Sequence, residues 1–567
     1  MSAELQMKLA PDDQARYDSV AEHARRDEWA QRLFDRDASL WSTDPAVQAA
    51  IADRLGWLDA PEHFIEEIPA LEAFGDAIRV AGFTTAVVMG MGGSSLAPDM
   101  LHRIFGSADG YLALRILDST DPAAVAATVD DLDPLQTLWI VASKSGTTTE
   151  PLAFLADAWA RVEEALKRAG SGQNPGEFFV ATTDPGRSLA SIPHHDDFRE
   201  RFLNPPDIGG RYSALTYVGL VPASLIGLDL DPLLSTGAAM LAECREPDPA
   251  ANPGLRLGLL LGSLALGGRD KLTLLVDESI ASFGAWLEQL IAESTGKHGV
   301  GIVPIDLEPV RTAKDYGPDR VFVSIGIGGQ RPPEVFHEVA RLGHPVIRIE
   351  IDDPIDLAGE AIRWEVATAF AGAVLGIDAF DQPNVEQAKE LTRRVLAAAG
   401  SSDADGVAID AGGDAIPTLS VATLGEAGLS ARFATIGGHK PPEYIGIQAF
   451  IAPSAASDAG IRHLRETLGA TGCATTAGYG PRFLHSTGQL HKGGPRSGVF
   501  LQLTSDHPTD RPIPGWPYTF GRLIDAQARG DREAIVANGR AIAHVHLGTD
   551  IEADLATLER AIARVLA

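Results

Sequence analysis

The sequence predicts an α/β fold with parallel sheets flanked by helices, and three observations lead to it. Short apolar runs alternate with longer stretches of helical spacing, an order typical of strand–helix–strand units. Several of these runs end in turns rich in glycine or hydroxyl side chains, where parallel sheets present ligand loops. One pattern also occurs twice, because TTAVVMGMGGSS (84–95) is echoed by DRVFVSIGIGGQ (319–330).

Composition shifts and linkers divide the chain into four predicted segments. They are a helical N-terminal segment (1–75), two alternating α/β units (76–245 and 246–398) and an α/β C-terminal extension (407–567). Stretches rich in Gly, Pro or small polar residues serve as linkers at 246–256 and 397–406. Expected strands are 84–89, 113–117, 137–142, 177–182, 271–276, 319–325 and 345–351, with further apolar runs at 444–451 and 498–503.

Charge and composition exclude several classes of function. The net charge of −30 argues against nucleic acid and anionic membranes as partners. Only Cys244 and Cys473 are present, so no disulfide framework is implied and a reducing compartment fits. The first residues lack the features of a signal peptide, and no run of about 18 apolar residues occurs. We therefore expect a cytoplasmic protein.

The stretch VASKSGTTT (141–149) is the most informative in the chain. It follows a buried strand and precedes a helix start at Glu150. A hydroxyl-rich turn at a helix N-terminus offers backbone N–H groups, side-chain donors and the positive end of the helix dipole. We expect it to hold a phosphate monoester, and the alternative is an ordinary Ser/Thr-rich loop. The glycine loop at 90–95 also follows a strand, so the two loops could share one pocket.

Two charged residues stand in unusual positions. Arg211 follows two glycines in IGGRYS, where it could project a fork of donors toward an anion, or lie in a surface turn. Glu293 lies in the last turn of a predicted helix, where a carboxylate is poorly placed beside the negative end of the dipole. Such a residue suits a general base. The alternative is a solvated Glu293 paired with Lys297.

Five motifs occur in one order: MGMGGSSLAP, SKSGTTTE, GGRYS, EQLIAESTGK and FDQPNVEQAK. Together they cover roughly residues 85–395, and in this combination the chain resembles phosphoglucose isomerase. The resemblance implies two sugar-isomerase (SIS) domains, each a parallel sheet flanked by helices. It also implies the interconversion of glucose 6-phosphate and fructose 6-phosphate in glycolysis and gluconeogenesis. That reaction passes through a cis-enediol and uses neither metal nor cofactor.

The same resemblance assigns roles to residues at the matching positions. Arg211 would stabilise the enediolate, Glu293 would move the proton, and Lys389 would take part in ring opening. The substrate-binding positions implied are Gly93, Ser94, Ser143, Lys144, Ser145, Thr147, Thr148, Gln289 and Gln382.

The chain departs from the family pattern in its histidines and in a long tail after Lys389. Where the family carries its ring-opening histidine, residues 336–351 hold His337 and His344 without the usual motif. The tail contains FLHSTGQLHKGGPRSGVFLQL (483–503), in which HKGGPRSGVFLQL, with YTFGRL downstream (518–523), resembles the family's His-bearing segment. The tail also resembles the end of the isomerase half of bacterial transaldolase–isomerase fusions. We predict a site loop there, with His491 as the acid and His485 as the alternative, possibly beside Lys492.

The resemblance also bears on assembly and on competing functions. The family takes its ring-opening histidine from a neighbouring subunit, which implies a homodimer; a histidine from the same chain would allow a monomer. Two other functions stay open: a non-catalytic sugar-phosphate sensor, and another sugar-phosphate isomerase of the same fold. Arg211, Glu293 and Lys389 together favour the isomerase.

Overall fold

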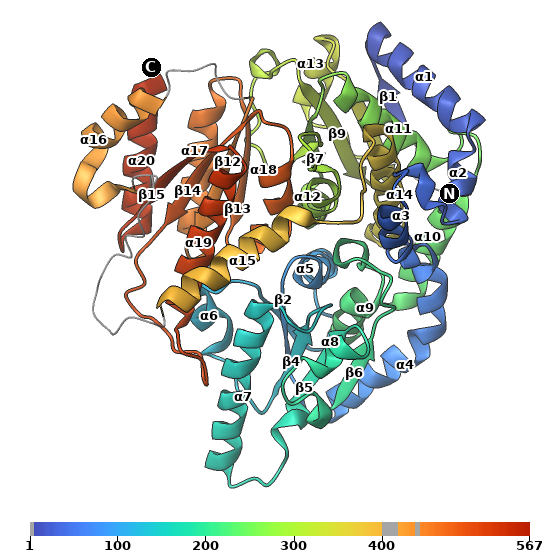
Figure 1. Ribbon diagram of the computed structural model, residues 1–567. Coiled ribbons are helices and arrows are strands. Elements are labelled where there is room, and N and C mark those ends of the chain that lie inside the picture. Colours follow the sequence, from blue (N-terminus) through green and yellow to red (C-terminus); the bar gives the residue numbers. More distant parts are fainter. Residues whose placement is uncertain (1–4, 400–417, 437–442, 567) are drawn as a thin grey trace. The chain divides into compact units, whose positions relative to one another are not determined.

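The computed structural model describes residues 5–399, 418–436 and 443–566, and within them the strands form three five-stranded sheets (Figure 1). The chain divides into two compact units. Unit 1 comprises Met1–Asp118, Thr128–Leu307 and Pro318–Asp381. Unit 2 comprises Ser119–Ala127, Glu308–Gly317 and Gln382–Ala567. The predicted α/β class with parallel sheets flanked by helices is confirmed.

The first sheet of unit 1 is parallel throughout, in the order β3-β2-β4-β5-β6. Its strands are β2 (Thr85–Gly90), β3 (Ala113–Leu117), β4 (Thr137–Ala142), β5 (Phe179–Thr183) and β6 (Glu200–Leu203). All six residues of β4 are buried, as expected for a central strand covered on both faces. The edge strand β6 begins with exposed Glu200 and Arg201, so it carries no apolar run that would reveal it.

Helices with clear end signals accompany this sheet. They are α5 (Gly93–Phe105), α7 (Thr149–Ala169), α8 (Arg187–Ala190), α9 (Tyr217–Leu225) and α10 (Leu230–Glu243). In α7, Glu150 lies in the first turn and Lys167 and Arg168 in the last, which complements the helix dipole. Gly170 ends α7 at φ 63°, a left-handed conformation that glycine adopts without strain.

The second sheet of unit 1 has the order β1-β10-β9-β7-β8 and is parallel except for β1. Its strands are β1 (Leu5–Lys8), β7 (Lys271–Val276), β8 (Val303–Ile305), β9 (Arg320–Ile327) and β10 (Val346–Ile351). The remaining helices of unit 1 are α1 (Pro11–Arg26), α2 (Trp29–Phe34), α3 (Pro45–Ala52), α4 (Ala60–Val80), α11 (Pro253–Leu266), α12 (Ser282–Thr295), α13 (Glu334–Arg341) and α14 (Leu357–Leu375).

The N-terminal segment differs from its prediction at both ends. It is mostly helical, but β1 adds an antiparallel edge strand to β10, with Leu5 opposite Ile349. Four residues are too few to show strand periodicity, so the pairing partner decides their structure. At the other end α4 runs past residue 75, so a helix crosses the predicted boundary.

Unit 2 holds the third sheet, which is parallel throughout in the order β11-β15-β14-β12-β13. Its strands are β11 (Thr418–Ser420), β12 (Tyr444–Phe450), β13 (Ala474–Tyr479), β14 (Gly498–Thr504) and β15 (Ala541–His546). Its helices include α15 (Pro383–Ala399), α16 (Val421–Ile436), α17 (Ala455–Gly469), α18 (Gly488–Gly493), α19 (Phe520–Ala537) and α20 (Ile551–Leu566).

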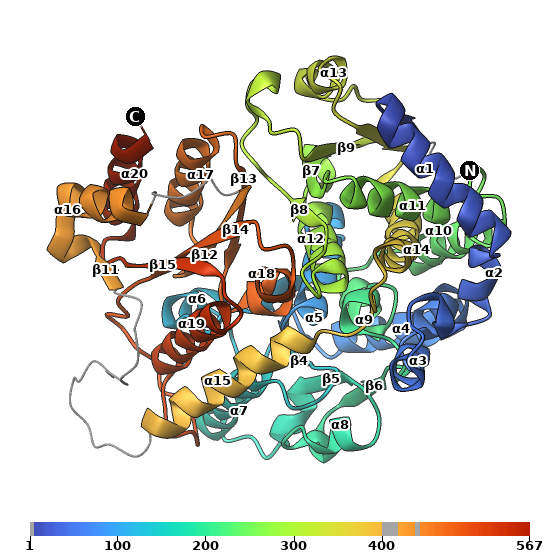
Figure 2. The ribbon, with the colours of Figure 1, turned by 45° about the horizontal axis from the view of Figure 1, so that its top comes forward.

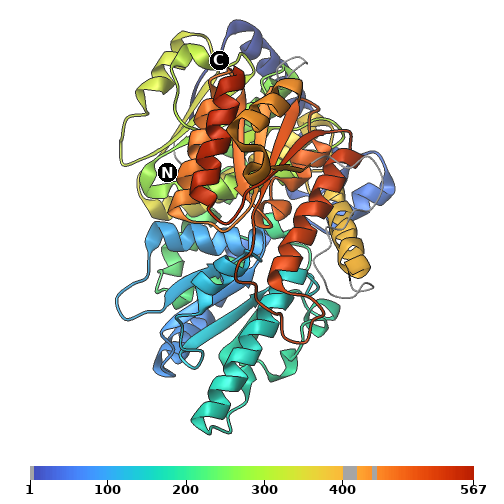
Figure 3. The same cartoon turned by 90° about the vertical axis from the view of Figure 1, so that its left-hand side faces the viewer.

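The unit 2 sheet has an apolar face and a more polar one. Helices α17 and α20 lie side by side on the apolar face (Figures 2 and 3). There Ile447 and Leu503 pack with Leu464 and Leu558.

Helix α15, predicted as the end of the second sugar-isomerase domain, belongs to unit 2. Of the linker predicted at 397–406, residues 400–406 lie outside the described residues.

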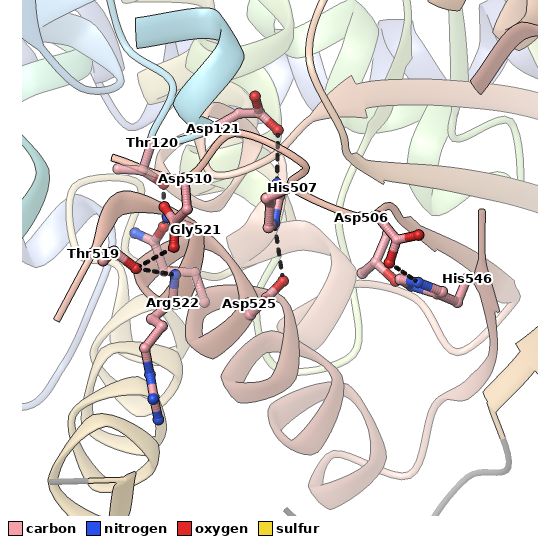
Figure 4. Close-up of polar contacts among 12 residues, drawn as sticks. Thr120, Asp121, Asp506, His507, Asp510, Thr519, Gly521, Arg522, Asp525 and His546 are labelled. Atoms are coloured by element: carbon pink, nitrogen blue, oxygen red, sulfur yellow. Dashed lines mark hydrogen bonds and ion pairs between the residues drawn. The ribbon is translucent and has the colours of Figure 1, made fainter. Parts of the chain in front are cut away.

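The connection between β3 and α6 (Pro122–Val129) belongs to unit 2, and polar contacts explain why (Figure 4). Thr120 Oγ1 donates to Gln527 Oε1 at 2.7 Å. His507 lies between two carboxylates, 3.6 Å from Asp121 and 3.2 Å from Asp525. Burial lowers the pKa of His507, but Asp525 and Asp121 outweigh it and raise that pKa above its ordinary value. His507 therefore links this connection to Asp525 on α19.

Candidate active site

The hydroxyl-rich loop forms a preorganised turn between β4 and α7. Ser143 is buried, and its Oγ donates to Thr148 Oγ1 at 3.2 Å. Ser145 Oγ lies 3.0 Å from Thr147 Oγ1 and accepts from the backbone N–H of Thr147 at 3.3 Å. Thr148 is the N-cap of α7, but its side chain makes no capping hydrogen bond. The loop therefore presents hydroxyls together with a helix N-terminus, as an anion site requires.

Gly146 and Lys144 shape the back of this loop. Gly146 has φ +65°, and a Cβ there would lie 1.8 Å from Ser188 O, so only glycine fits. Lys144 Nζ donates to Asp184 at 2.5 Å and to Pro206 O at 2.8 Å. Burial lowers the pKa of Lys144 and the paired Asp184 opposes that effect. Lys144 thus ties the loop to the neighbouring strand ends.

The glycine loop after β2 lies at the same edge of the sheet. β2 and β4 are neighbours, with Gly90 opposite Ala142, so the loops that follow them leave the same edge. A Cβ on Gly93 would lie 2.0 Å from Gly210 O. This close backbone approach joins the Gly93–Ser94 turn to the GGRYS segment, which is how the fold brings two distant motifs together.

Arg211 is buried and held in one orientation. It lies on the short 3-10 helix Gly210–Tyr212 and is 3% exposed. Its Nε donates to Ser294 Oγ at 2.7 Å, and its Nη2 donates to the carbonyls of Ala379 (2.8 Å) and Asp381 (3.1 Å). The alternative of a surface arginine is therefore wrong.

Glu293 is buried beside Arg211. On α12 it is 8% exposed, and its Oε1 lies 3.5 Å from Arg211 Nη1. Its Oε2 accepts from Gln289 Nε2, one turn earlier, at 3.2 Å. Lys297 is ion-paired with Asp381 instead, so the alternative of a solvated Glu293–Lys297 pair is wrong. The site thus combines a buried carboxylate, which can accept a proton, with a fixed cation, which can stabilise an oxyanion.

Four predicted site residues belong to unit 2. Gln382 lies just before α15 and Lys389 lies within it, where Lys389 Nζ contacts Glu386 Oε1 at 2.8 Å. His491 is 4% exposed, contacts Gln448 Nε2 at 3.1 Å, and burial lowers its pKa well below the ordinary value. His485 lies on a 3-10 helix before it and is half-buried.

The predicted site loop around His491 is wrong in its local structure. The segment forms helix α18, and His491 and Lys492 are both buried in it. Lys492 Nζ pairs with Asp531 Oδ1 at 2.5 Å and donates to Gly488 O at 3.1 Å. An exposed cluster of His, Lys and Gly was expected, but α19 supplies the buried carboxylate that allows this lysine to be internal.

The other two histidines lie in the second α/β part of unit 1. His337 is exposed on α13. His344 lies just before β10, at the amino end of the parallel strands, edge-on to Phe322 with ring centroids 5.4 Å apart. Burial, with Arg269 nearby, lowers the pKa of His344.

Several residues that build this site were missed in the sequence. Ser294 and Tyr212 directly follow Glu293 and Arg211, so their motifs could have flagged them. The carbonyls of Ala379 and Asp381 could not be found, because every residue has a carbonyl and only the fold selects two of them. In the part of the chain that the structure describes, no three His, Cys, Asp or Glu side chains are arranged to hold a metal ion. No described helix is long and apolar enough to cross a bilayer.

A family model and several relatives match this chain. The phosphoglucose isomerase family model matches residues 37–308. The glucose-6-phosphate isomerase of Rubrobacter xylanophilus is 29% identical over 397 residues, which are 61% of this chain and 90% of that protein. The probable glucose-6-phosphate isomerase of Natronomonas pharaonis is 30% identical over 376 residues, 59% of this chain and 85% of that protein.

A solved structure has a similar fold. The crystal structure of a hypothetical protein from Thermus thermophilus superposes with a TM-score of 0.58 at 26% identity. The superposition covers 70% of this chain and 100% of that one.

Proposed function

The chain belongs to the phosphoglucose isomerase family, and on that premise we propose that it interconverts glucose 6-phosphate and fructose 6-phosphate through a cis-enediol. The observation that supports this reaction most directly is the buried group of Gln289, Glu293 and Arg211. A carboxylate confined between an amide and a guanidinium cannot turn away to solvent. The Glu293 carboxylate therefore stays in a fixed position beside Arg211, where it can accept a proton.

Glu293 acts as the base in this proposal. It takes the proton from C2 of the open-chain aldose, and the electrons of that C–H bond form the C1–C2 double bond. Charge develops on the former carbonyl oxygen, where the Arg211 guanidinium stabilises it. The hydroxyl proton on O2 passes to O1, and Glu293 returns its own proton to C1 as the C2–O bond becomes the carbonyl. This yields the ketose and restores the carboxylate. One carboxylate thus serves both steps, and atoms and charge balance without a co-reactant.

The loop of residues 143–148 holds the phosphate in this proposal. Its hydroxyls and the N-terminus of α7 bind the dianion, remote from the reacting carbons. The binding energy gained there positions C1 and C2 at the base. Gly93 and Ser94 stand at the same sheet edge and contact the sugar.

We expect Ser143→Ala and Thr148→Ala each to weaken binding of fructose 6-phosphate. A hydrogen bond to a charged group contributes about 1.5–3 kcal/mol, so each change raises Kd about 10- to 150-fold. Isothermal titration calorimetry measures this directly. Ser171→Ala, just beyond the other end of α7, is the matched control and leaves Kd unchanged. Normal binding by both loop variants would contradict the phosphate assignment.

Ring opening is a separate proposal: the family resemblance implies Lys389, and the tail segment implies His491 as the acid, with His485 as the alternative. His491→Ala and His485→Ala are compared on cyclic substrate and on pre-opened sugar analogues. The variant that removes the ring-opening acid slows turnover of the cyclic form only, because an acid at the ring oxygen is needed only to cleave the hemiacetal. If both variants open the ring normally while His337→Ala or His344→Ala does not, ring opening belongs to the segment 336–351.

The competing functions are separated by one measurement on the wild-type protein. A coupled assay for glucose 6-phosphate formed from fructose 6-phosphate gives steady turnover if the proposal holds. A sensor would bind fructose 6-phosphate without turnover. Another sugar-phosphate isomerase would form no glucose 6-phosphate, whether it converts fructose 6-phosphate to a different aldose phosphate or acts on a different ketose phosphate. Either result would replace the proposed reaction.

A further inference from the structure

Lys297 is a fully buried cation that the proposed reaction does not use. It follows α12 after Gly296 and is 0% exposed. Its Nζ donates to Asp378 O at 2.5 Å and lies 2.7 Å from Asp381 Oδ1. Both contacts are to the segment 378–381, which follows α14. Burial of a cation is unfavourable unless close polar partners compensate the lost hydration, so the partners of Lys297 are informative.

The segment that Lys297 holds is the segment that holds Arg211. The carbonyls of Ala379 and Asp381 accept from Arg211 Nη2 at 2.8 and 3.1 Å. The turn is also braced internally, since the Phe380 backbone N–H donates to Asp378 Oδ1 at 2.7 Å. Lys297 therefore reaches Arg211 through one short piece of backbone, with every link at hydrogen-bond distance.

We propose that Lys297 is a positioning residue for Arg211, acting as a protonated clasp on residues 378–381. The inference rests on the proposed function for the meaning of Arg211, but the clasp itself is a structural statement. With the clasp closed, the two carbonyls keep the guanidinium turned so that Nη1 faces Glu293. With the clasp open, Arg211 loses these acceptors and its orientation.

The charged groups around Lys297 make the clasp sensitive to pH. Those that act on it are Arg211, Asp378 and Asp381. Glu293 on α12 pairs with Arg211, and Glu365 on α14 acts on the neighbouring Tyr212. Burial first, and then Arg211, lower the pKa of Lys297 to about 8, while Asp381 and Asp378 oppose them. Raising the pH through this value removes the proton and with it the ion pair to Asp381. Turnover should therefore fall on the alkaline side.

Asp381→Asn is the decisive variant, because the Asp381 side chain is 43% exposed and the change is isosteric. Asp381 raises the pKa of Lys297, so its neutralisation moves the alkaline fall of kcat to lower pH. At neutral pH we expect kcat to drop about tenfold with KM nearly unchanged, as a misplaced catalytic group would cause. Lys297→Met should give the same drop without the alkaline fall near pH 8.

The control is another buried lysine in unit 1. Lys271 is 1% exposed and pairs with Asp270 (2.7 Å) and Asp319 (3.4 Å) on the second sheet. Asp319→Asn removes a comparable charge and should leave the alkaline fall of kcat in place. If Asp381→Asn keeps the wild-type pH profile, or if Asp319→Asn shifts it equally, the proposal is overturned.

Hydrogen–deuterium exchange tests the clasp without using activity. In Lys297→Met and Asp381→Asn, backbone exchange should rise in peptides covering 378–381 and 209–213. In wild type, raising the pH from 7 to 9 should increase exchange in these peptides by more than the intrinsic pH dependence of amide exchange. Unchanged exchange would overturn the clasp. An inactive wild-type protein with the expected exchange would instead overturn the proposed reaction and leave the clasp established.

Discussion

Replacing Glu293 by glutamine lowers turnover by at least ~10²-fold, while binding of fructose 6-phosphate is largely retained. The reason is that glutamine keeps the shape of the side chain and a hydrogen-bonding oxygen for Gln289 but cannot accept the proton from carbon. The loss should appear in kcat rather than in KM, because the phosphate loop and Arg211 are untouched. A coupled assay with both sugar phosphates measures the two parameters.

Glu288→Gln is the matched control for this prediction. Glu288 lies on the same helix and is half-buried, and its Oε1 contacts the backbone N–H of Asp306 instead of the site. We expect near-normal turnover in that variant. Near-normal turnover in Glu293→Gln would remove Glu293 from the role of base, and an equal loss in both variants would indicate damage to α12.

Replacing Lys492 by methionine destabilises unit 2 by about 3–5 kcal/mol, because it leaves Asp531 charged and buried without its partner. Lys492 and Asp531 side chains are 1% and 0% exposed, so water cannot substitute for the lost cation. Native-state hydrogen exchange in β12 and β14 reports the stability of this unit. The double variant Lys492→Met/Asp531→Leu should recover most of the loss, since it removes both charges.

Arg529→Met provides the comparison on the same helix. Arg529 and Glu533 form a pair on α19 whose side chains are 23% and 41% exposed. Breaking such a pair should cost no more than about 1 kcal/mol. Equal effects of Lys492→Met and Arg529→Met would contradict the structural role of the buried pair. If the double variant is stable but has lost turnover, Lys492 acts in the reaction rather than in the core.

Local hydrophobic patterns in the sequence predicted much of the fold. Central strands such as β4 are continuous apolar runs, because both faces of a parallel sheet are buried, and β3, β4 and β7 begin and end where they were predicted. Short edge strands carried no such signal. β1 depends on pairing with β10, and β6 is largely polar, so neither could be found from its own residues.

Motifs likewise indicated which residues form the candidate site. Hydroxyls between a strand and a helix, an arginine after two glycines and a glutamate at a helix end are visible in sequence because each stands out by residue type and position. The structure added what joins them, since a Cβ on Gly93 would meet Gly210 O, and Arg211 Nη1 faces Glu293.

What the sequence by itself determined is thus the α/β class, most strands and the residue types of the candidate site. Only the tertiary structure decided which charged groups are buried and with whom. Lys297 stands one helical turn after Glu293 in the motif but pairs with Asp381, and Lys492 looks like part of an exposed loop but pairs with Asp531. The physical reason is that the free energy of a buried charge depends on a partner far away in sequence. No local pattern can reveal that partner before the chain has folded.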